Sequence, residues 1–182
     1  MLEEYLTRYK FSIITESSNI HPDLNRDKTT NYFVSYKPKS IVIYDTYNNP
    51  FFPYSDIVFD KATFDLPRYH DYLNKKIGLN LEFLPFHYYI EYITNDYYII
   101  NTRPLLMKPL IEQDKFKQYE ESIHICILGD TNSDIYDKSL YKKLHSLLKH
   151  LFIIFKWGNL NKTKIKFLNI GKNFYENKIF VS

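Results

Sequence analysis

The clearest pattern in the chain is a helical spacing of apolar residues in the segment 139–157. The residues that recur at steps of three and four are Leu140, Leu144, Leu147, Leu148, Leu151, Ile154 and Phe155. This spacing places them on one face of an amphipathic helix. Asp137 can cap its N-terminus, and Gly158-Asn159 can end it in a left-handed cap. The pattern predicts a long helix that packs on a core.

Three strands are predicted before this helix. Residues 84–92 and 97–104 are rich in aromatic and β-branched side chains, and Thr94-Asn95-Asp96 between them has the composition of a short turn. Residues 122–128 form an apolar run that stops at Gly129-Asp130, which is typical of a strand buried on both faces. We therefore expect a hairpin followed by a central strand.

Shorter elements are predicted on either side of this block. Residues 40–43 are β-branched and indicate a strand, and ligands of open α/β sheets usually bind at the carboxyl end of such a strand. A helix is expected from Lys61 or Asp65 to Lys76, with Asp65 as its cap and Pro67 in its first turn. Residues 57–59 suggest a short strand or turn, and the alternation at 164–168 predicts a final strand.

The tyrosines of the hairpin form two adjacent pairs, Tyr88-Tyr89 and Tyr97-Tyr98. Because side chains alternate along a strand, one ring of each pair is expected to point away from the core. Exposed tyrosines are typical of interfaces and carbohydrate-stacking surfaces, whereas partly buried sheet tyrosines are the simpler interpretation.

The first 39 residues form an extension before the main domain, which spans residues 40–182. Residues 2–9 have the spacing of a short amphipathic helix, and residues 17–28 have the composition of a polar loop. The extension is either a strap packed on the domain or an arm that docks into a neighbouring subunit.

Composition indicates a single folded domain, long enough at 182 residues to bury a core without disulfides or metal. Hydrophobic content of 45% excludes disorder, and no apolar run approaches the roughly 20 residues of a membrane span. Met1-Leu2-Glu3-Glu4 is not the start of a secretory signal, and the single Cys126 cannot form an internal disulfide. Both features fit synthesis in a reducing cytosol.

A net charge of +3 is too small to indicate a nucleic-acid partner, and none is expected. The basic residues gather late in the chain, at Lys138, Lys142, Lys143, Lys149, Lys156, Lys162, Lys164, Lys166, Lys172 and Lys178. They are either the solvated face of the last helix with an exposed strand, or a contact for an anionic polymer or an acidic partner. The sequence favours neither.

The order of hairpin, central strand and long helix resembles the zinc-dependent N-acetylmuramoyl-L-alanine amidase family, which includes phage lysozymes of the T7 type and peptidoglycan-recognition proteins. The segments that carry the resemblance are Phe86-His87-Tyr88-Tyr89-Ile90, Arg103-Pro104, residues 122–129, residues 40–46 and Arg68-Tyr69-His70. It covers roughly residues 38–170. It implies an α/β, amidase-like three-layer fold with a mixed central β-sheet flanked by helices.

The resemblance also implies a zinc site, with three protein ligands and an open position for water. The first ligand position is Tyr44 here, followed by Asp45. The second falls among Asn169, Gly171 and Lys172, and beyond Ile170 the only carboxylate side chain is Glu176. The aromatic position near the family's metal, often Tyr, is Phe86. All three ligand positions have therefore departed from the pattern.

The histidines are the candidate replacements. His70 and His87 stand where the family has framework histidines and are expected to pack, and His124 replaces a small residue in the central strand. A zinc site rebuilt from Asp45, His87 and His124 is the alternative, although such sites also need partners for the ligands themselves. The chain has only four glycines and no Cys-x-x-Cys pair, so neither a phosphate-cradling loop nor a cysteine metal site is expected.

Three functional hypotheses follow. The first is a catalytically inactive amidase-like domain without a cofactor, serving as a structural or assembly component of a bacteriophage virion, in the tail or baseplate, made in the host cytoplasm and bound to other subunits. The second is an active zinc amidase, an endolysin, that uses Asp45, His87 or His124. The third is a peptidoglycan-binding module. Its groove would be lined by residues of the former cleft: Tyr44, Asp45, Phe86 and Lys172.

Overall fold

The centre of the molecule is a mixed six-stranded sheet in a computed structural model that describes residues 2–14, 37–54, 64–77, 81, 83–111 and 114–181. In order across the sheet the strands are β1 (Ser12–Ile14), β4 (Asp96–Asn101), β3 (Tyr88–Ile93), β5 (Ser122–Ile127), β2 (Ser40–Asp45) and β6 (Ile165–Phe167). Strand β2 runs parallel to β5 and β6, and β3 runs parallel to β5. The two pairs that include β4 are antiparallel.

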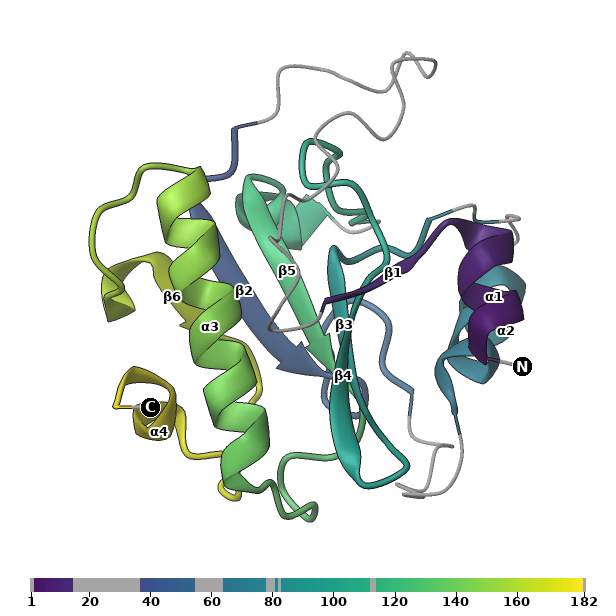
Figure 1. Ribbon diagram of the computed structural model, residues 1–182. Helices are drawn as coiled ribbons and strands as arrows, with labels where there is room; N and C mark the ends of the chain where they lie inside the picture. The colour runs from purple at the N-terminus through teal and green to yellow at the C-terminus, as the bar shows by residue number, and fades with distance from the viewer. Residues whose placement is uncertain are drawn as a thin grey trace.

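Helices cover both faces of this sheet (Figure 1). Helices α1 (Leu2–Tyr9) and α2 (Leu66–Ile77) lie on one side, and α3 (Lys138–Ile154) and α4 (Glu176–Phe180) lie on the other. Two short 3₁₀ helices, η1 (Asp114–Tyr119) and η2 (Lys162–Lys164), lie in the connections. The predicted three-layer α/β fold is confirmed. Within the described ranges, no helix has the length and apolarity needed to cross a membrane.

Alternation along the strands divides the core in two. In β2, Ile41 and Ile43 pack with α3, whereas Val42 packs with α2. In β3, Tyr88 joins the first cluster and Tyr89 the second, and both rings are fully buried. The expectation that one ring of this pair is exposed is wrong, because helices cover both faces of the sheet. The rings of Tyr88 and Tyr89 fill the core and offer no surface to a ligand.

The long helix begins as predicted and ends earlier. The Asp137 carboxylate accepts hydrogen bonds from the backbone N–H groups of Ser139 (2.8 Å) and Leu140 (3.3 Å). The helix ends at Ile154, and Lys156 adopts a left-handed conformation with φ 55°. Trp157 N–H then bonds to the carbonyl of Phe152 at 2.9 Å, which closes a Schellman motif. The predicted cap at Gly158 is therefore too late, because Trp157 folds back onto the helix.

Replacing Asp137 by alanine is expected to lower the free energy of unfolding by about 1 kcal/mol, because two N–H groups at the start of α3 lose their acceptor. Urea denaturation measures the change. Asp137→Ser keeps an acceptor oxygen and should lose much less. A serine variant as unstable as the alanine variant would mean that Asp137 acts through its charge and not as a cap.

The described part of the N-terminal extension belongs to this same fold. Strand β1 pairs antiparallel with β4, with Ser12 opposite Asn101. The Tyr5 hydroxyl of α1 lies 2.7 Å from His70 Nδ1 of α2. The helix was predicted and the strand was not. The predicted polar loop at 17–28 and the short strand at 57–59 lie outside the described residues.

Candidate functional site

A buried polar network joins the loops that follow β2, β5 and β6, at the sheet edge where the sequence places the candidate site. Its centre is the carboxylate of Asp45, which is fully buried at the end of β2. It accepts hydrogen bonds from Thr131 N–H at 2.9 Å and from the Thr131 hydroxyl at 2.5 Å. It also accepts from the backbone and side-chain N–H groups of Asn48, at 2.5 and 3.0 Å. The hydrogen-bonding capacity of the carboxylate is thus used by the loops that follow β2 and β5.

Thr131 carries the network on to the loop after β6. Its hydroxyl accepts a hydrogen bond from Gly171 N–H at 2.5 Å, and its carbonyl accepts one from Asn173 N–H at 3.0 Å. A Cβ on residue 171 would collide with the backbone of Thr131 and Asn132, so this close approach requires glycine. The Asn169 side chain also donates to the carbonyl of Asn48 at 3.0 Å. Hydrogen bonds thus join the loops that follow β2, β5 and β6 directly to one another.

Asp130 extends this network towards solvent. Its carboxylate accepts from Asn48 Nδ2 at 2.9 Å, Asn132 N–H at 3.0 Å and the Ser133 hydroxyl at 3.0 Å. Partial burial raises the pKa of Asp130, but these hydrogen bonds outweigh burial and hold the pKa below its ordinary value. Asp130 is therefore a structural acceptor that stays ionised.

Tyr44 and His124 form a second, separate contact beneath these loops. The Tyr44 hydroxyl lies 3.1 Å from His124 Nδ1, and His124 Nε2 lies 2.9 Å from the carbonyl of Tyr119. A carbonyl only accepts, so Nε2 carries the proton and Nδ1 accepts from Tyr44. Burial lowers the pKa of His124 to about 4. The imidazole is neutral, and both of its nitrogens have protein partners.

His87 has the same kind of surroundings. Its Nδ1 accepts from His124 N–H at 3.0 Å, and its Nε2 donates to the carbonyl of Met107 at 2.9 Å. Burial, followed by the nearby His124, holds the pKa of His87 well below its ordinary value. The two rings are 6.3 Å apart between centroids, and the Asp45 carboxylate is hydrogen-bonded to Asn48 and Thr131. These donors do not fit a zinc ion, because their lone pairs are used inside the fold.

A metal site could also be built from side chains other than Asp45, His87 and His124. In the parts of the chain that the structure describes, no three His, Cys, Asp or Glu side chains are grouped so that they could hold a metal ion.

Comparison with known proteins identifies the fold. The endolysin N-acetylmuramoyl-L-alanine amidase LysCS from Clostridium intestinale URNW matches with a TM-score of 0.52 and 16% sequence identity, over 84% of this chain and 90% of that chain. The N-acetylmuramoyl-L-alanine amidase LysC from the same organism matches equally, over 91% of its own length. The fold is amidase-like. No family model matches the sequence, and no curated protein matches it.

Within the amidase-like fold, the four residues assigned to the former cleft do not share one surface. Tyr44, Asp45 and Phe86 are buried, and Lys172 is exposed on the loop after β6. The Phe86 ring stacks on Tyr69 with a centroid distance of 5.9 Å. Of the four, only Lys172 is placed to meet a ligand without rearrangement.

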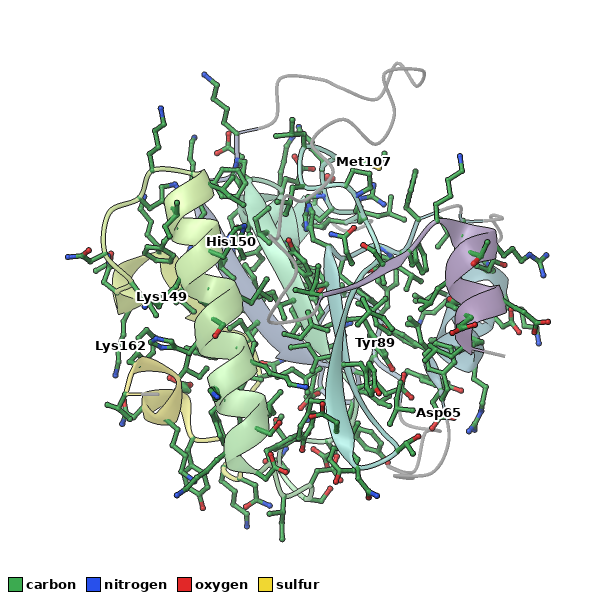
Figure 2. The ribbon with its side chains drawn as sticks, in the orientation of Figure 1. Asp65, Tyr89, Met107, Lys149, His150 and Lys162 are labelled. Carbon is green, nitrogen blue, oxygen red and sulfur yellow. The ribbon has the colours of Figure 1, made fainter. Side chains whose placement is uncertain are left out.

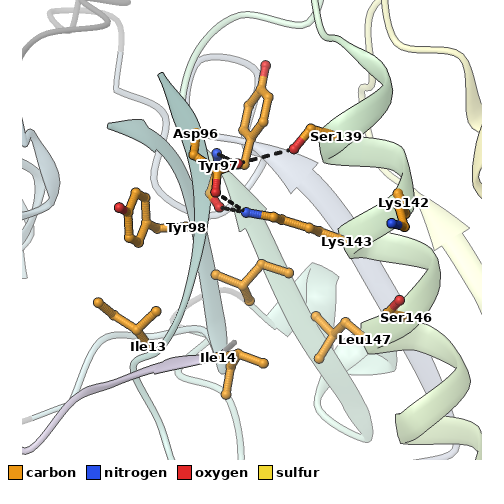
Figure 3. Close-up of a pocket in the computed structure, with 11 residues that line it drawn as sticks. Ile13, Ile14, Asp96, Tyr97, Tyr98, Ser139, Lys142, Lys143, Ser146 and Leu147 are labelled. Atoms are coloured by element: carbon orange, nitrogen blue, oxygen red, sulfur yellow. Dashed lines mark hydrogen bonds and ion pairs between the residues drawn. The ribbon is translucent and has the colours of Figure 1, made fainter. Parts of the chain in front are cut away.

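A groove elsewhere on the amidase-like fold was missed by sequence reasoning. It has a volume of about 510 Å³ and lies between β1, β4 and the first half of α3 (Figure 3). Ile13, Ile14 and Leu147 line its apolar part, and at one end Asp96 pairs with Lys143 at 2.6 Å. No local signal indicated this groove, because it depends on the pairing of β1 with β4, which are far apart in sequence.

Proposed function

We propose that the chain is a catalytically inactive amidase-like domain that serves as a structural or assembly component, in the tail or baseplate of a bacteriophage virion, with other protein subunits as its partners. The observation that carries this proposal is the network of Asp45, Thr131 and Gly171, which fills the sheet edge where the resemblance implies zinc. Residues that close a site by bonding to each other stabilise the fold and leave no ligand for a metal.

The surroundings of Tyr44 support the same interpretation. It stands at the first ligand position of the resemblance, and its ring packs against Phe51 at 5.2 Å while its hydroxyl bonds to His124. Burial raises the pKa of Tyr44 well above its ordinary value, so the hydroxyl stays protonated at neutral pH. A protonated, hydrogen-bonded phenol is a poor substitute for the neutral imidazole that zinc prefers.

The test combines metal content with activity on one sample of the full chain. After dialysis against a weak chelator, we expect much less than one zinc per chain by mass spectrometry. Added zinc should produce no hydrolysis of purified peptidoglycan, measured as loss of turbidity and as newly released amino groups. A folded sample with about one zinc per chain, and with hydrolysis that chelation stops and zinc restores, would refute the proposal.

The second candidate is an active zinc-dependent amidase acting as an endolysin, and the support for it is that both structural neighbours are N-acetylmuramoyl-L-alanine amidases. The zinc and hydrolysis measurements decide between it and the first. A peptidoglycan-binding module is the third candidate, for which the exposed Lys172 is the available contact. Co-sedimentation with purified cell walls, compared between the wild type and Lys172→Ala, tests that role. Recovery of the chain in purified particles instead of free lysate would support assembly over wall binding.

A further inference from the structure

Positive charge is concentrated at the C-terminal end of the chain. Residues 138–182 contain ten lysines and one acidic side chain, Glu176, which gives a net charge of +9. Residues 1–137 contain 14 basic and 20 acidic side chains, for a net charge of −6. The positive segment includes α3, β6 and α4, and the two helices form the layer on one face of the sheet (Figure 1). The protein therefore has a strongly basic side.

Four lysines of this segment form a stripe along the outer face of α3. Lys138, Lys142, Lys149 and Lys156 are all exposed, and their spacings of four, seven and seven residues repeat nearly whole helical turns. Lys156, the second residue past the helix, continues the spacing. In Figure 2, Lys149 lies on the side of α3 that faces away from α1 and α2. Asp137, at the N-cap, is an acidic residue next to Lys138 in sequence.

A pocket adjoins one end of the stripe, between α3 and α4. Its volume is about 440 Å³, and it is lined by Lys138, Tyr141, Lys142, Lys178 and Val181. Lys178 Nζ lies 5.3 Å from the centre of the Tyr141 ring, which is buried. Lysine stems, an aromatic ring and a valine give the pocket apolar walls, and three of its five lining residues are lysines. The pocket suits an apolar side chain that has carboxylates next to it.

Exposed apolar side chains occur in this positive segment and, at Ile135, just before it. Among the described residues, five large apolar side chains are exposed, and four of them are Ile135 (84%), Ile153 (70%), Tyr175 (53%) and Val181 (84%). Ile153 lies on α3 between Lys149 and Lys156, and Val181 lines the pocket. Apolar side chains among charges of one sign are typical of a surface that binds protein. A phosphate polymer would use the lysines but gain nothing from Ile153 or Val181.

We infer that this surface of α3 and α4 docks an acidic protein segment, with one apolar side chain in the pocket and carboxylates along the lysine stripe. The inference rests on the proposed assembly function, for which it supplies the chemistry of the partner. The lysines of the stripe are exposed, and charge pairing at exposed positions mainly sets the association rate and the specificity. Most of the affinity is expected from the partner's apolar side chain in the pocket.

The probe is a fluorescent synthetic helix of about 18 residues, with leucines at helical spacing and glutamates beside them. Comparators are a scrambled peptide of the same composition, polyglutamate and a DNA duplex. Anisotropy with the full chain, at about 50 and about 300 mM NaCl, gives the affinities. We expect the patterned helix to bind at least roughly tenfold more tightly than every comparator, and more weakly at high salt.

Matched variants locate the binding. Lys138→Glu with Lys142→Glu, and separately Val181→Asp, should each weaken binding about tenfold or more, because they remove the charges and the apolar wall. Lys75→Glu with Lys76→Glu makes the same charge change at two exposed positions on α2 and should leave binding unchanged. Circular dichroism verifies that each variant is folded.

Two results would overturn the inference. Equal affinity for scrambled peptide, polyglutamate or DNA would show a surface that recognises charge alone. Unchanged binding by the folded α3 and Val181 variants would place the contact elsewhere. If either result comes from a sample without zinc or hydrolytic activity, the assembly proposal still stands, and the partner must bind another surface of the protein. Zinc-dependent hydrolysis would refute the assembly proposal whatever the peptide does.

Discussion

Asp45→Ala is expected to lower the free energy of unfolding by about 3 kcal/mol, because it leaves buried donors without an acceptor. Four hydrogen bonds from Asn48 and Thr131 end on this carboxylate, which has no exposed surface. Each buried polar group that loses its partner costs about 1 to 3 kcal/mol, reduced where water enters the space. Urea unfolding followed by tryptophan fluorescence measures the loss, with Trp157 as the only reporter.

The matched control is Asp114→Ala, which removes an exposed carboxylate at the start of η1 and should change stability by less than about 0.5 kcal/mol. Asp45→Asn should fall between the two, since an amide keeps one acceptor oxygen and turns its NH₂ towards another donor. An Asp45→Ala protein as stable as the wild type would show that the loops do not depend on this network. If it also lost bound zinc and hydrolytic activity, Asp45 would be a ligand, and the inactive-domain proposal would fail.

Local patterns predicted the elements whose cause lies within a few residues. The spacing of leucines gave α3, and Asp137 caps it as expected. Thr94 and Asn95 adopt positive φ values of 50° and 71°, so the turn composition between β3 and β4 was a true signal. Asp65 directly precedes α2, where it was predicted as the cap, and its carboxylate accepts a hydrogen bond from Arg68 at 2.8 Å. The causes of α3 and of the turn lie close to them in sequence.

What the sequence did not reveal depends on pairs far apart in the chain. Strand β1 is stabilised by the pairing of residues 12–14 with the edge of β4, and three residues are too short a run to predict a strand. The bond from Thr131 to Asp45 joins positions 86 residues apart. Resemblance located Tyr44 and Phe86 near the former cleft, but only the packing of both sheet faces shows that these rings are buried. The late cluster of lysines was visible in the sequence, whereas the stripe on α3 and the pocket beside it were not.

A long-range contact also places a carboxylate inside the protein. Glu91 of β3 is 1% exposed and faces the start of α2, where its two oxygens accept from the N–H groups of Asp65 (2.5 Å) and Leu66 (3.2 Å). The helix N-terminus favours negative charge there. Burial opposes it more strongly and raises the pKa of Glu91 to about 8. Glu91 is therefore largely protonated at neutral pH.

This shift makes stability depend on pH in a defined window. The folded-state pKa of Glu91 lies above its unfolded value, so its contribution is complete below about pH 4.5 and is lost as the pH rises through about 8. His87 and His124 have folded-state pKa values below their ordinary value of 6.5, so they lower stability increasingly as the pH falls through 6.5, with a small cost already present at pH 6.5. A Glu91→Gln variant keeps both histidines, so the difference between the wild type and this variant measures the contribution of Glu91 between pH 6.5 and 8.

We expect the free energy of unfolding of the wild type, taken relative to Glu91→Gln, to fall by about 1.5 kcal/mol from pH 6.5 to pH 8, since one bound proton changes stability by about 1.4 kcal/mol per pH unit at most. Glu91→Gln removes the ionisation and keeps an acceptor for α2, so its stability should rise slightly over this range, through the histidines alone. Glu3→Gln, at an exposed position on α1, should keep the wild-type slope. Urea unfolding at four pH values gives all three curves. A Glu91→Gln protein that keeps the wild-type slope would show that Glu91 is ionised in the folded protein, and the helix N-terminus would then be strong enough to hold a buried charge.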